Sequence, residues 1–235
     1  TPVVIFTNTP AIFENAVLKA VNNEAIDEDS DLVVCDFCVV TQSGSIYRNG
    51  ILSTNVDDII KDMLLYRTSF NVWNKMYKRD LYEGVEFPTA NMGEDLGTTF
   101  QLAVKCNKIS RITGSYYYYN GMTPSITRND TKSAIINRVL QACDNANSVI
   151  RMLDNSKYDA EIVYLKFRQR KQLMPIINDK DAYKIWKTIY PEINQRVILD
   201  YRLAIPLLDR VKFALTLTGI FPIIKQYTRK KSKKL

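Results

Sequence analysis

Two adjacent carboxylic acids follow a glycine in the stretch Gly93-Glu94-Asp95, and an apolar-periodic segment begins directly after them. A carboxylate within hydrogen-bond reach of an alcohol can take its proton while the oxygen attacks, so this pair could serve as a general base. The same residues also make an ordinary helix start, where acidic side chains accept backbone N–H bonds and face the positive end of the helix dipole. Spacing alone favours the cap, and only the surrounding segments favour catalysis.

The amino-acid composition excludes several other kinds of catalytic site. The 235 residues include no histidine, which excludes Ser-His-Asp catalysis, Cys-His pairs and histidine-ligated zinc. The four cysteines are too few and too scattered for a disulfide framework. Cys35 and Cys38 lie in the apolar run LVVCDFCVV, where a strand sends positions three apart to opposite faces, so we expect buried thiols and no metal or redox pair.

A second candidate group lies in the segment VWNKMY. Trp73 could stack on a sugar face, and Lys75 could contact phosphate or an acceptor oxygen, with Asn74 between them. The alternative is a packed strand in which Trp73 and Lys75 share one side and Asn74 lies on the other. A lysine between two aromatic residues favours the functional interpretation. Arg128, after the sequence SIT, could also reach phosphate, and a solvated loop arginine is its alternative.

Strand and helix patterns alternate in the first half of the chain. The run at residues 3–6 and the run at 32–40 predict buried strands, and the period of residues 12–21 predicts a helix between them. This order favours a βαβ unit and a parallel sheet. Further patterns predict a hairpin with its turn at Asn49-Gly50, a helix at 56–65, a helix after Gly93 and a half-buried strand that includes Tyr116–Tyr119.

Beyond residue 130 the sequence pattern changes from alternating strands and helices to helices alone. Residues 134–153, 160–173 and 182–190 are helical in period and contain no good strand. The sequence therefore predicts an α/β part at 1–130 and a helical C-terminal region at 131–235.

The ordered series VWNKMYKRDLYEGVEF, GEDL, an amphipathic helix, a short KIS strand, SYYYYN and SITR resembles the second half of a bacterial family 2 glycosyltransferase with the GT-A fold. The upstream SDLVVCDF is similar to the strand that follows the family's metal-binding motif. The resemblance implies a Rossmann-like mixed sheet without the N-terminal nucleotide-binding half. It also implies inverting transfer of a sugar from a nucleotide-sugar donor to a hydroxyl of a cell-surface glycan or lipid-linked acceptor. In that family the aspartate of the acidic pair is the general base, which is Asp95 here, with Glu94 orienting the acceptor or holding the loop.

One position departs from the family pattern. The family's Asp-x-Asp motif holds Mg²⁺ or Mn²⁺ against the donor diphosphate, and Thr7, Asn8 and Thr9 stand at that place, so no metal site is evident. An alternative alignment makes Asp36 the base-binding aspartate but leaves too little chain before GEDL. Three explanations stay open: a fragment of a larger enzyme, a degenerate relative, or a chain that takes its donor site from a partner. Each predicts weak or no activity for the chain alone.

The C-terminal segment 207–235 combines an apolar amphipathic pattern with a basic cluster. Five of the last seven residues are lysine or arginine, within a formal net charge of +7. This pattern predicts attachment to an anionic membrane surface, and a core helix followed by a solvated tail is the alternative. No apolar run is long enough for a membrane span and no signal peptide is visible, so we expect a cytoplasmic location, at the inner face of the membrane.

Two further function classes stay in view. The first is a noncatalytic module that docks a partner within a glycosyltransferase system. The absence of the Asp-x-Asp motif is consistent with this function. Nucleic-acid binding ranks lower, because the basic charge is confined to one end of the chain. The sequence leaves the oligomeric state open.

Overall fold

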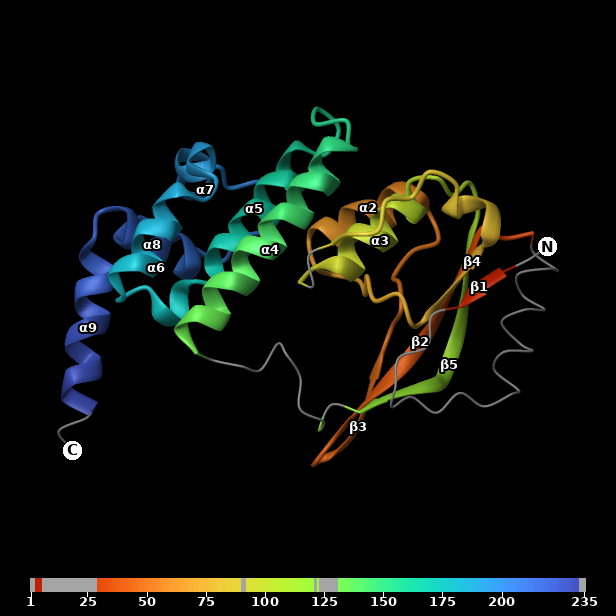
Figure 1. Ribbon diagram of the computed structural model, residues 1–235, viewed down its shortest axis with the longest axis horizontal. Coiled ribbons are helices and arrows are strands. Elements are labelled where there is room, and N and C mark those ends of the chain that lie inside the picture. The colour runs from red at the N-terminus through yellow and green to blue at the C-terminus, as the bar shows by residue number, and fades with distance from the viewer. Residues whose placement is uncertain (1–2, 6–28, 90–91, 121, 123–130, 233–235) are drawn as a thin grey trace. The chain divides into compact units, whose positions relative to one another are not determined.

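The computed structural model describes residues 3–5, 29–89, 92–120, 122 and 131–232 (Figure 1). The chain divides into two compact units, Thr1–Arg128 and Asn129–Leu235, which we call the sheet unit and the helical unit. Among the described residues, the sheet unit contains β1 (Val3–Ile5), β2 (Leu32–Thr41), β3 (Gly44–Arg48), α2 (Val56–Leu64), β4 (Lys75–Lys78), the 3₁₀ turn η1 (Arg79–Tyr82), α3 (Glu94–Ala103) and β5 (Ile109–Asn120).

The sheet is mixed and is organised around β2. The first half of β2 pairs antiparallel with β4, and its second half pairs antiparallel with β3. On its other edge β2 pairs parallel with β5, with a register shift between Cys35 and Phe37. β1 pairs antiparallel with β4. Residues Leu32–Cys38 of β2 are all buried, as expected for a strand with neighbours on both edges and a covered face.

Two details of the expected topology are wrong. β1 and β2 are not neighbours in a βαβ unit, because β4 lies between them and runs antiparallel to both. The hairpin turn is not at Asn49-Gly50 but at Gln42-Ser43, since Thr41 pairs with Gly44. The expected helix at 12–21 lies outside the described residues.

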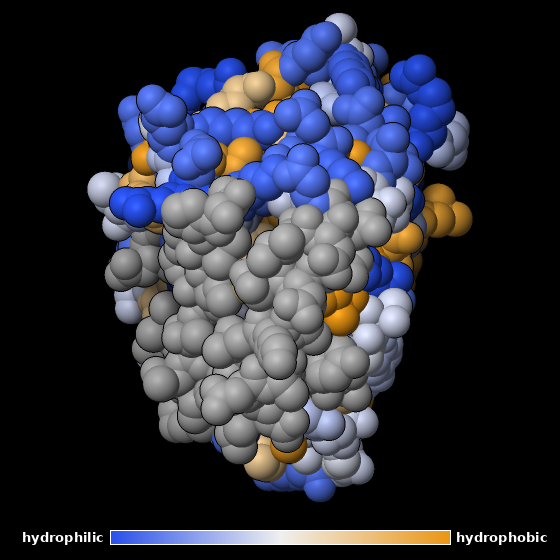
Figure 2. Space-filling view, turned by 90° about the vertical axis from the view of Figure 1, so that its right-hand side faces the viewer, coloured by the Kyte–Doolittle hydropathy of each residue, from blue (hydrophilic) through white to orange (hydrophobic). Residues whose placement is uncertain are grey.

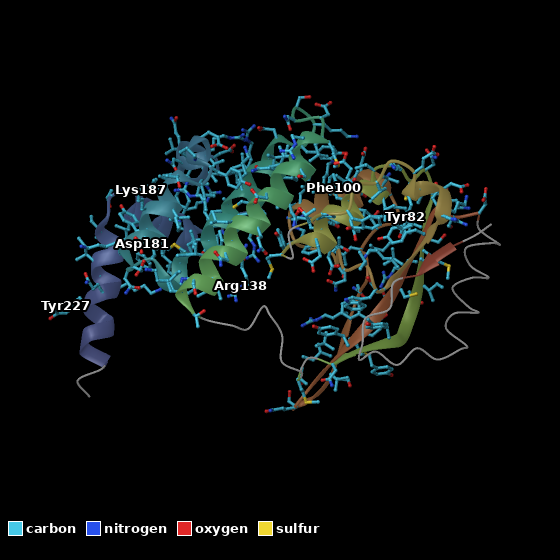
Figure 3. All side chains as sticks on the ribbon, in the orientation of Figure 1. Tyr82, Phe100, Arg138, Asp181, Lys187 and Tyr227 are labelled. Carbon is cyan, nitrogen blue, oxygen red and sulfur yellow. The ribbon has the colours of Figure 1, made fainter. Side chains whose placement is uncertain are left out.

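Helices α2 and α3 contact each other and lie on the same side of the sheet (Figure 1). Asn55 caps α2 by accepting a bond from the Asp58 N–H at 3.2 Å. Phe100, on α3, is fully buried (Figure 3). On the face in Figure 2 the described atoms belong mostly to hydrophilic residues, with scattered hydrophobic side chains among them. Leu64 of α2 and Leu96 of α3 are almost fully buried, like Phe100.

The helical unit contains no strand among its described residues. Its elements are α4 (Lys132–Arg151), α5 (Asp159–Lys171), the 3₁₀ turns η3 (Met174–Ile176) and η4 (Pro191–Ile193), α6 (Lys180–Thr188), α7 (Asn194–Leu199), α8 (Leu207–Leu217) and α9 (Ile220–Ser232). The helices expected at 134–153, 160–173 and 182–190 are confirmed. Their core gathers around Trp186 and includes Phe167, Leu173 and Phe213.

The segment 207–224 forms two helices. Gly219 follows the end of α8 with a φ of +81°, a left-handed conformation that glycine adopts without a steric penalty. Pro222 lies in the first turn of α9, where its missing N–H removes no helical bond. None of the described helices is long and apolar enough to span a membrane.

Candidate active site

The acidic pair lies in the first turn of α3. Gly93 precedes the helix with a φ of +81°, so the chain enters it through a left-handed residue. Glu94 is exposed and Asp95 is half-buried. Gly97, one turn below, lets the preceding loop pack closely, because a Cβ there would lie 2.7 Å from Cγ of Pro88. The glycines of GEDLG thus set both the direction of the helix and the position of the loop before it.

A buried lysine supports the loop at residues 69–74, which faces this turn. Lys75 is 4% exposed, and its Nζ donates to the backbone oxygens of Ser69 at 2.9 Å and Asn71 at 2.6 Å. The third bond goes to Oδ1 of Asn74 at 2.9 Å, while Nδ2 of Asn74 donates to the oxygen of Cys35 at 2.8 Å. The ammonium can donate three hydrogen bonds and makes three. The loop is therefore fixed to β2 through two side chains.

α3 holds the same loop from the other side. Oγ1 of Thr99 donates to the backbone oxygen of Phe70 at 2.6 Å. The backbone N–H of Val72 donates to the Asp95 carboxylate. Asp95 is thus held against the loop through a backbone hydrogen bond.

The surroundings of Asp95 make it a better base than a solvated aspartate. Burial and the neighbouring charge of Glu94 raise the pKa of Asp95 to about 6, and the charge of Lys75 and the Val72 N–H reduce that rise. A carboxylate with a pKa near 6 is mostly ionised at neutral pH and binds a proton more strongly than an ordinary one. This is the balance that general-base catalysis requires.

Lys75 responds in the opposite direction. Complete burial lowers the pKa of its ammonium to about 7, and the negative charge of Asp95 opposes that change. The two residues therefore favour one another's charged forms. A change in the charge of Lys75 alters the proton affinity of Asp95 near neutral pH.

A second carboxylate, Asp36, lies at the register shift between β2 and β5. It is fully buried and accepts two bonds from Arg111, Nε to Oδ1 at 3.0 Å and Nη2 to Oδ2 at 2.7 Å. The backbone N–H of Gly50 donates to Oδ1 at 2.7 Å, and the hydroxyl of Tyr47 donates to Oδ2. Burial opposes ionisation of Asp36, but these bonds outweigh it and hold its pKa below the ordinary value. Asp36 is occupied by its own chain and presents no oxygen to a nucleotide base.

Three of the four candidate substrate-binding residues, Trp73, Asn74 and Lys75, are buried in the core of the sheet unit. Trp73 is 5% exposed and stacks on Tyr117 and Tyr119, with ring centroids 4.3 and 5.4 Å away. Asn74 is 2% exposed. Trp73, Asn74 and Lys75 are therefore buried by their own chain, in contacts with β2, β5 and the loop at residues 69–71. Arg128 and the triplet at residues 7–9 lie outside the described residues.

The described part of the chain contains no group of three histidine, cysteine, aspartate or glutamate residues that could hold a metal ion. Residues 7–9, which stand at the place of the metal-binding motif of the resembled family, are not among the described residues. All four cysteines are free and buried, as expected.

Several of these contacts carry no signal in the sequence. The acceptors of Lys75 are mainly backbone oxygens, and the donor to Asp95 is a backbone N–H, so no residue type reveals them. The partners Asp36 and Arg111 are 75 positions apart. A lysine flanked by aromatic residues is the one local indication that this segment is unusual.

No protein-family model matches the sequence, and no curated protein matches it. Among solved structures, the chain is similar to residues 1–349 of TarS from S. aureus, a glycosyltransferase, with a TM-score of 0.61 and 13% identity. That match covers 97% of this chain and 67% of TarS 1–349. The TarS complex with UDP-GlcNAc matches with a TM-score of 0.57 and 14% identity, over 97% of this chain and 68% of that one.

The TarS complex with UDP matches with a TM-score of 0.52 and 14% identity, over 97% of this chain and 67% of that one. At these identities the likeness concerns the fold. The chain has a fold similar to that of a glycosyltransferase, and because the match covers nearly the whole chain, the likeness includes residues of both units.

Proposed function

We propose that this chain is a glycosyltransferase, or part of one, that transfers a sugar from a nucleotide-sugar donor to a hydroxyl acceptor, with Asp95 as the general base. The single observation that carries the proposal is a half-buried carboxylate at a helix start whose pKa is raised to about 6, in a chain with this fold. The TarS complexes with UDP-GlcNAc and UDP support a uridine nucleotide-sugar as the donor.

The proposed reaction needs one proton acceptor. The acceptor oxygen attacks the anomeric carbon, its bond to that carbon forms, and the bond from the carbon to the donor phosphate breaks. Asp95 takes the hydroxyl proton, and the nucleoside diphosphate leaves with the electron pair. Single displacement from the opposite face inverts the anomeric centre. No step of the proposal is assigned to a metal ion.

Lys75 and Asn74 act in this proposal by positioning, and Trp73 by packing beneath the loop. Because Lys75 holds the backbone of Ser69 and Asn71, the Val72 N–H is fixed where it reaches Asp95. Glu94 is exposed beside the base, where it is free to orient an acceptor hydroxyl and where its charge maintains the proton affinity of Asp95.

The test is transfer from UDP-GlcNAc by the longest natural gene product that contains these residues, with and without Mg²⁺ or Mn²⁺. Asp95→Asn should lower the rate by roughly 100-fold or more, because it removes the base and preserves the side-chain shape. Asp80→Asn, an exposed carboxylate of η1, is the matched control and should stay within about twofold of wild type. Equal rates for Asp95→Asn and wild type would remove Asp95 from the mechanism.

We further propose that α8 and α9 attach the chain to an anionic membrane surface. Leu207 and Leu208 on α8 are 71% and 64% exposed, and Ile223 and Tyr227 on α9 are 67% and 72% exposed. Tyr227 projects outward from α9 (Figure 3). Exposed apolar side chains on helices that lead into a basic cluster suit the boundary of an anionic bilayer.

Vesicle flotation tests this attachment without disturbing the core. The double variant Ile223→Ser, Ile224→Ser should lose binding to vesicles with about 30% phosphatidylserine, whereas substitution of the exposed Leu140 of α4 by serine should not. Equal flotation of both variants and wild type, or equal binding to neutral vesicles, would contradict the proposal.

A further inference from the structure

A cavity of about 370 Å³ lies within the helical unit, bounded by residues of α5, η3, α6, α8 and α9. The aromatic part of its wall is formed by Phe167, Trp186, Phe213 and Phe221. Trp186 and Phe213 contact each other with ring centroids 5.0 Å apart. The volume falls in the range of about 300–1,000 Å³ that is usual for small-molecule sites.

Lysine side chains from three helices line the same cavity. Lys212 of α8 and Lys225 of α9 are half-buried, and Lys225 donates to the backbone oxygens of Met174 and Pro175. Lys171 of α5 pairs with Asp209 at 2.5 Å. Asp209 is the one carboxylate among the described lining residues, and Lys171 already neutralises it. The polar part of the cavity is therefore positively charged.

Another cation lies behind the aromatic wall. The guanidinium of Arg170 is fully buried, 3.9 Å from the ring centroid of Trp186 and 4.7 Å from that of Phe213. Its Nη1 donates to Oδ1 of Asn194 at 2.5 Å and to the oxygen of Tyr190 at 3.3 Å. Nε and Nη2 of Arg170 have no hydrogen-bond partner among the described residues.

Arg170 thus adds a positive charge close to two of the aromatic rings that line the cavity. A buried cation whose donors are incompletely satisfied is stabilised by negative charge nearby. Nε1 of Trp186, in the cavity wall, is likewise buried with no partner in the described part of the unit. A negatively charged ligand with a hydrocarbon part would satisfy both the charge and the apolar walls.

We propose that this cavity binds an anionic amphiphile, with its hydrocarbon chain between the aromatic walls and its phosphate or carboxylate head at Lys212 and Lys225. The site is separate from Asp95, which belongs to the sheet unit. It is also separate from the exposed face at Ile223 and Ile224, because neither residue lines the cavity.

Calorimetric titration with dodecyl phosphate, kept below its micelle concentration, tests the site. We expect one equivalent to bind with a Kd of roughly 10–500 µM, as is usual for a ligand of this size. Tryptophan emission should change on binding, because Trp186 lines the cavity. Uncharged dodecyl maltoside should bind at least about tenfold more weakly, and inorganic phosphate should not bind measurably. Dodecanoate has a hydrocarbon chain of similar length and a carboxylate head, so its affinity shows whether the head must be a phosphate.

Variants distinguish this site from other basic surfaces. Lys212→Glu should weaken dodecyl phosphate about tenfold or more, while Lys184→Glu, an exposed lysine of α6 outside the cavity, should leave the Kd unchanged. Asp209→Asn should strengthen binding about threefold, because it removes the one negative charge in the lining. Thermal unfolding of each variant shows that it is folded.

Three results would overturn the proposal. Equal affinities for dodecyl phosphate and dodecyl maltoside would show that charge has no part. Equal effects of Lys212→Glu and Lys184→Glu would place binding elsewhere. Loss of binding in the Ile223→Ser, Ile224→Ser variant with full binding in Lys212→Glu would assign the amphiphile to the exposed helix face, without bearing on sugar transfer.

Discussion

Asp36 and Asp95 are carboxylates of the same unit, and their surroundings shift their pKa values in opposite directions. Asp36 is fully buried and accepts bonds from Arg111, Tyr47 and the Gly50 N–H, which hold its pKa below the ordinary value. Asp95 is half-buried, receives one backbone N–H and has a like charge beside it, and its pKa is raised to about 6. The number of donors around each carboxylate, more than its burial, separates the two.

This difference indicates different roles. A carboxylate whose lone pairs are all satisfied stabilises the fold and has little affinity for a proton. A partly buried carboxylate with few hydrogen-bond donors around it lowers the stability of the folded state and can accept a proton from a substrate. The comparison predicts that neutralising these two aspartates changes stability with opposite sign.

The largest effect should follow Asp36→Asn. The variant leaves the Arg111 guanidinium without its bidentate partner and places an amide N–H₂ where the oxygen accepted bonds, so we expect a loss of about 3–5 kcal/mol in the free energy of unfolding. Urea denaturation measures it. Adding Arg111→Met should recover part of the loss, because the unpaired cation is then removed. Additive losses from the two substitutions would show that the pair is not coupled.

A smaller effect of opposite sign should follow Asp95→Asn. The native pKa near 6 lies above the ordinary value of 3.8, so the contribution of the Asp95 carboxyl to stability is greatest below pH 4 and is lost as the pH rises from about 4 to 6. Asparagine does not titrate, and its stability advantage should therefore grow over that interval to roughly 1–2 kcal/mol at pH 7, after allowing for contact with water. Urea denaturation at pH 4 and pH 7 measures the change. If Asp95→Asn were less stable than wild type at pH 7, the proposed difference between the two carboxylates would be wrong.

The smallest effect should follow Glu94→Gln. Removing this negative charge lowers the pKa of Asp95, so the rise of kcat/KM with pH, which we expect near pH 6 in wild type, should move to lower pH by a few tenths of a unit. Because Glu94 is exposed, the shift should shrink in high salt. Glu83→Gln, another exposed carboxylate, is the control. A rise at the same pH in Glu94→Gln and wild type would show that Glu94 does not influence the base.

Much of the fold could be predicted because its signals are local. The runs at 3–6 and 32–40, and the helical periods from 134 onward, correspond to β1, β2, α4, α5 and α6. The burial of Cys35 and Cys38 follows from an apolar strand pattern. The helix start at Glu94 also follows from residues next to one another in the chain.

The surroundings of the site could not be predicted in the same way. A pattern in VWNKMY cannot distinguish a lysine that reaches a substrate from one that holds two backbone oxygens, because the difference lies in the path of residues 69–71. The hairpin turn was misassigned for a related reason. Asn49-Gly50 has turn chemistry, but Gly50 is used for close packing, since a Cβ there would lie 2.5 Å from the oxygen of Cys35.

The amino-acid sequence by itself determined β1, β2, α4, α5 and α6, the burial of the cysteines and the acidic pair that begins α3. The tertiary structure alone decided that β4 lies between β1 and β2, that Arg111 pairs with Asp36, and that side chains from α5, α6, α8 and α9 line one cavity. Secondary structure depends on neighbours within a few residues, whereas proton affinity and binding depend on which distant groups are brought within a few ångströms.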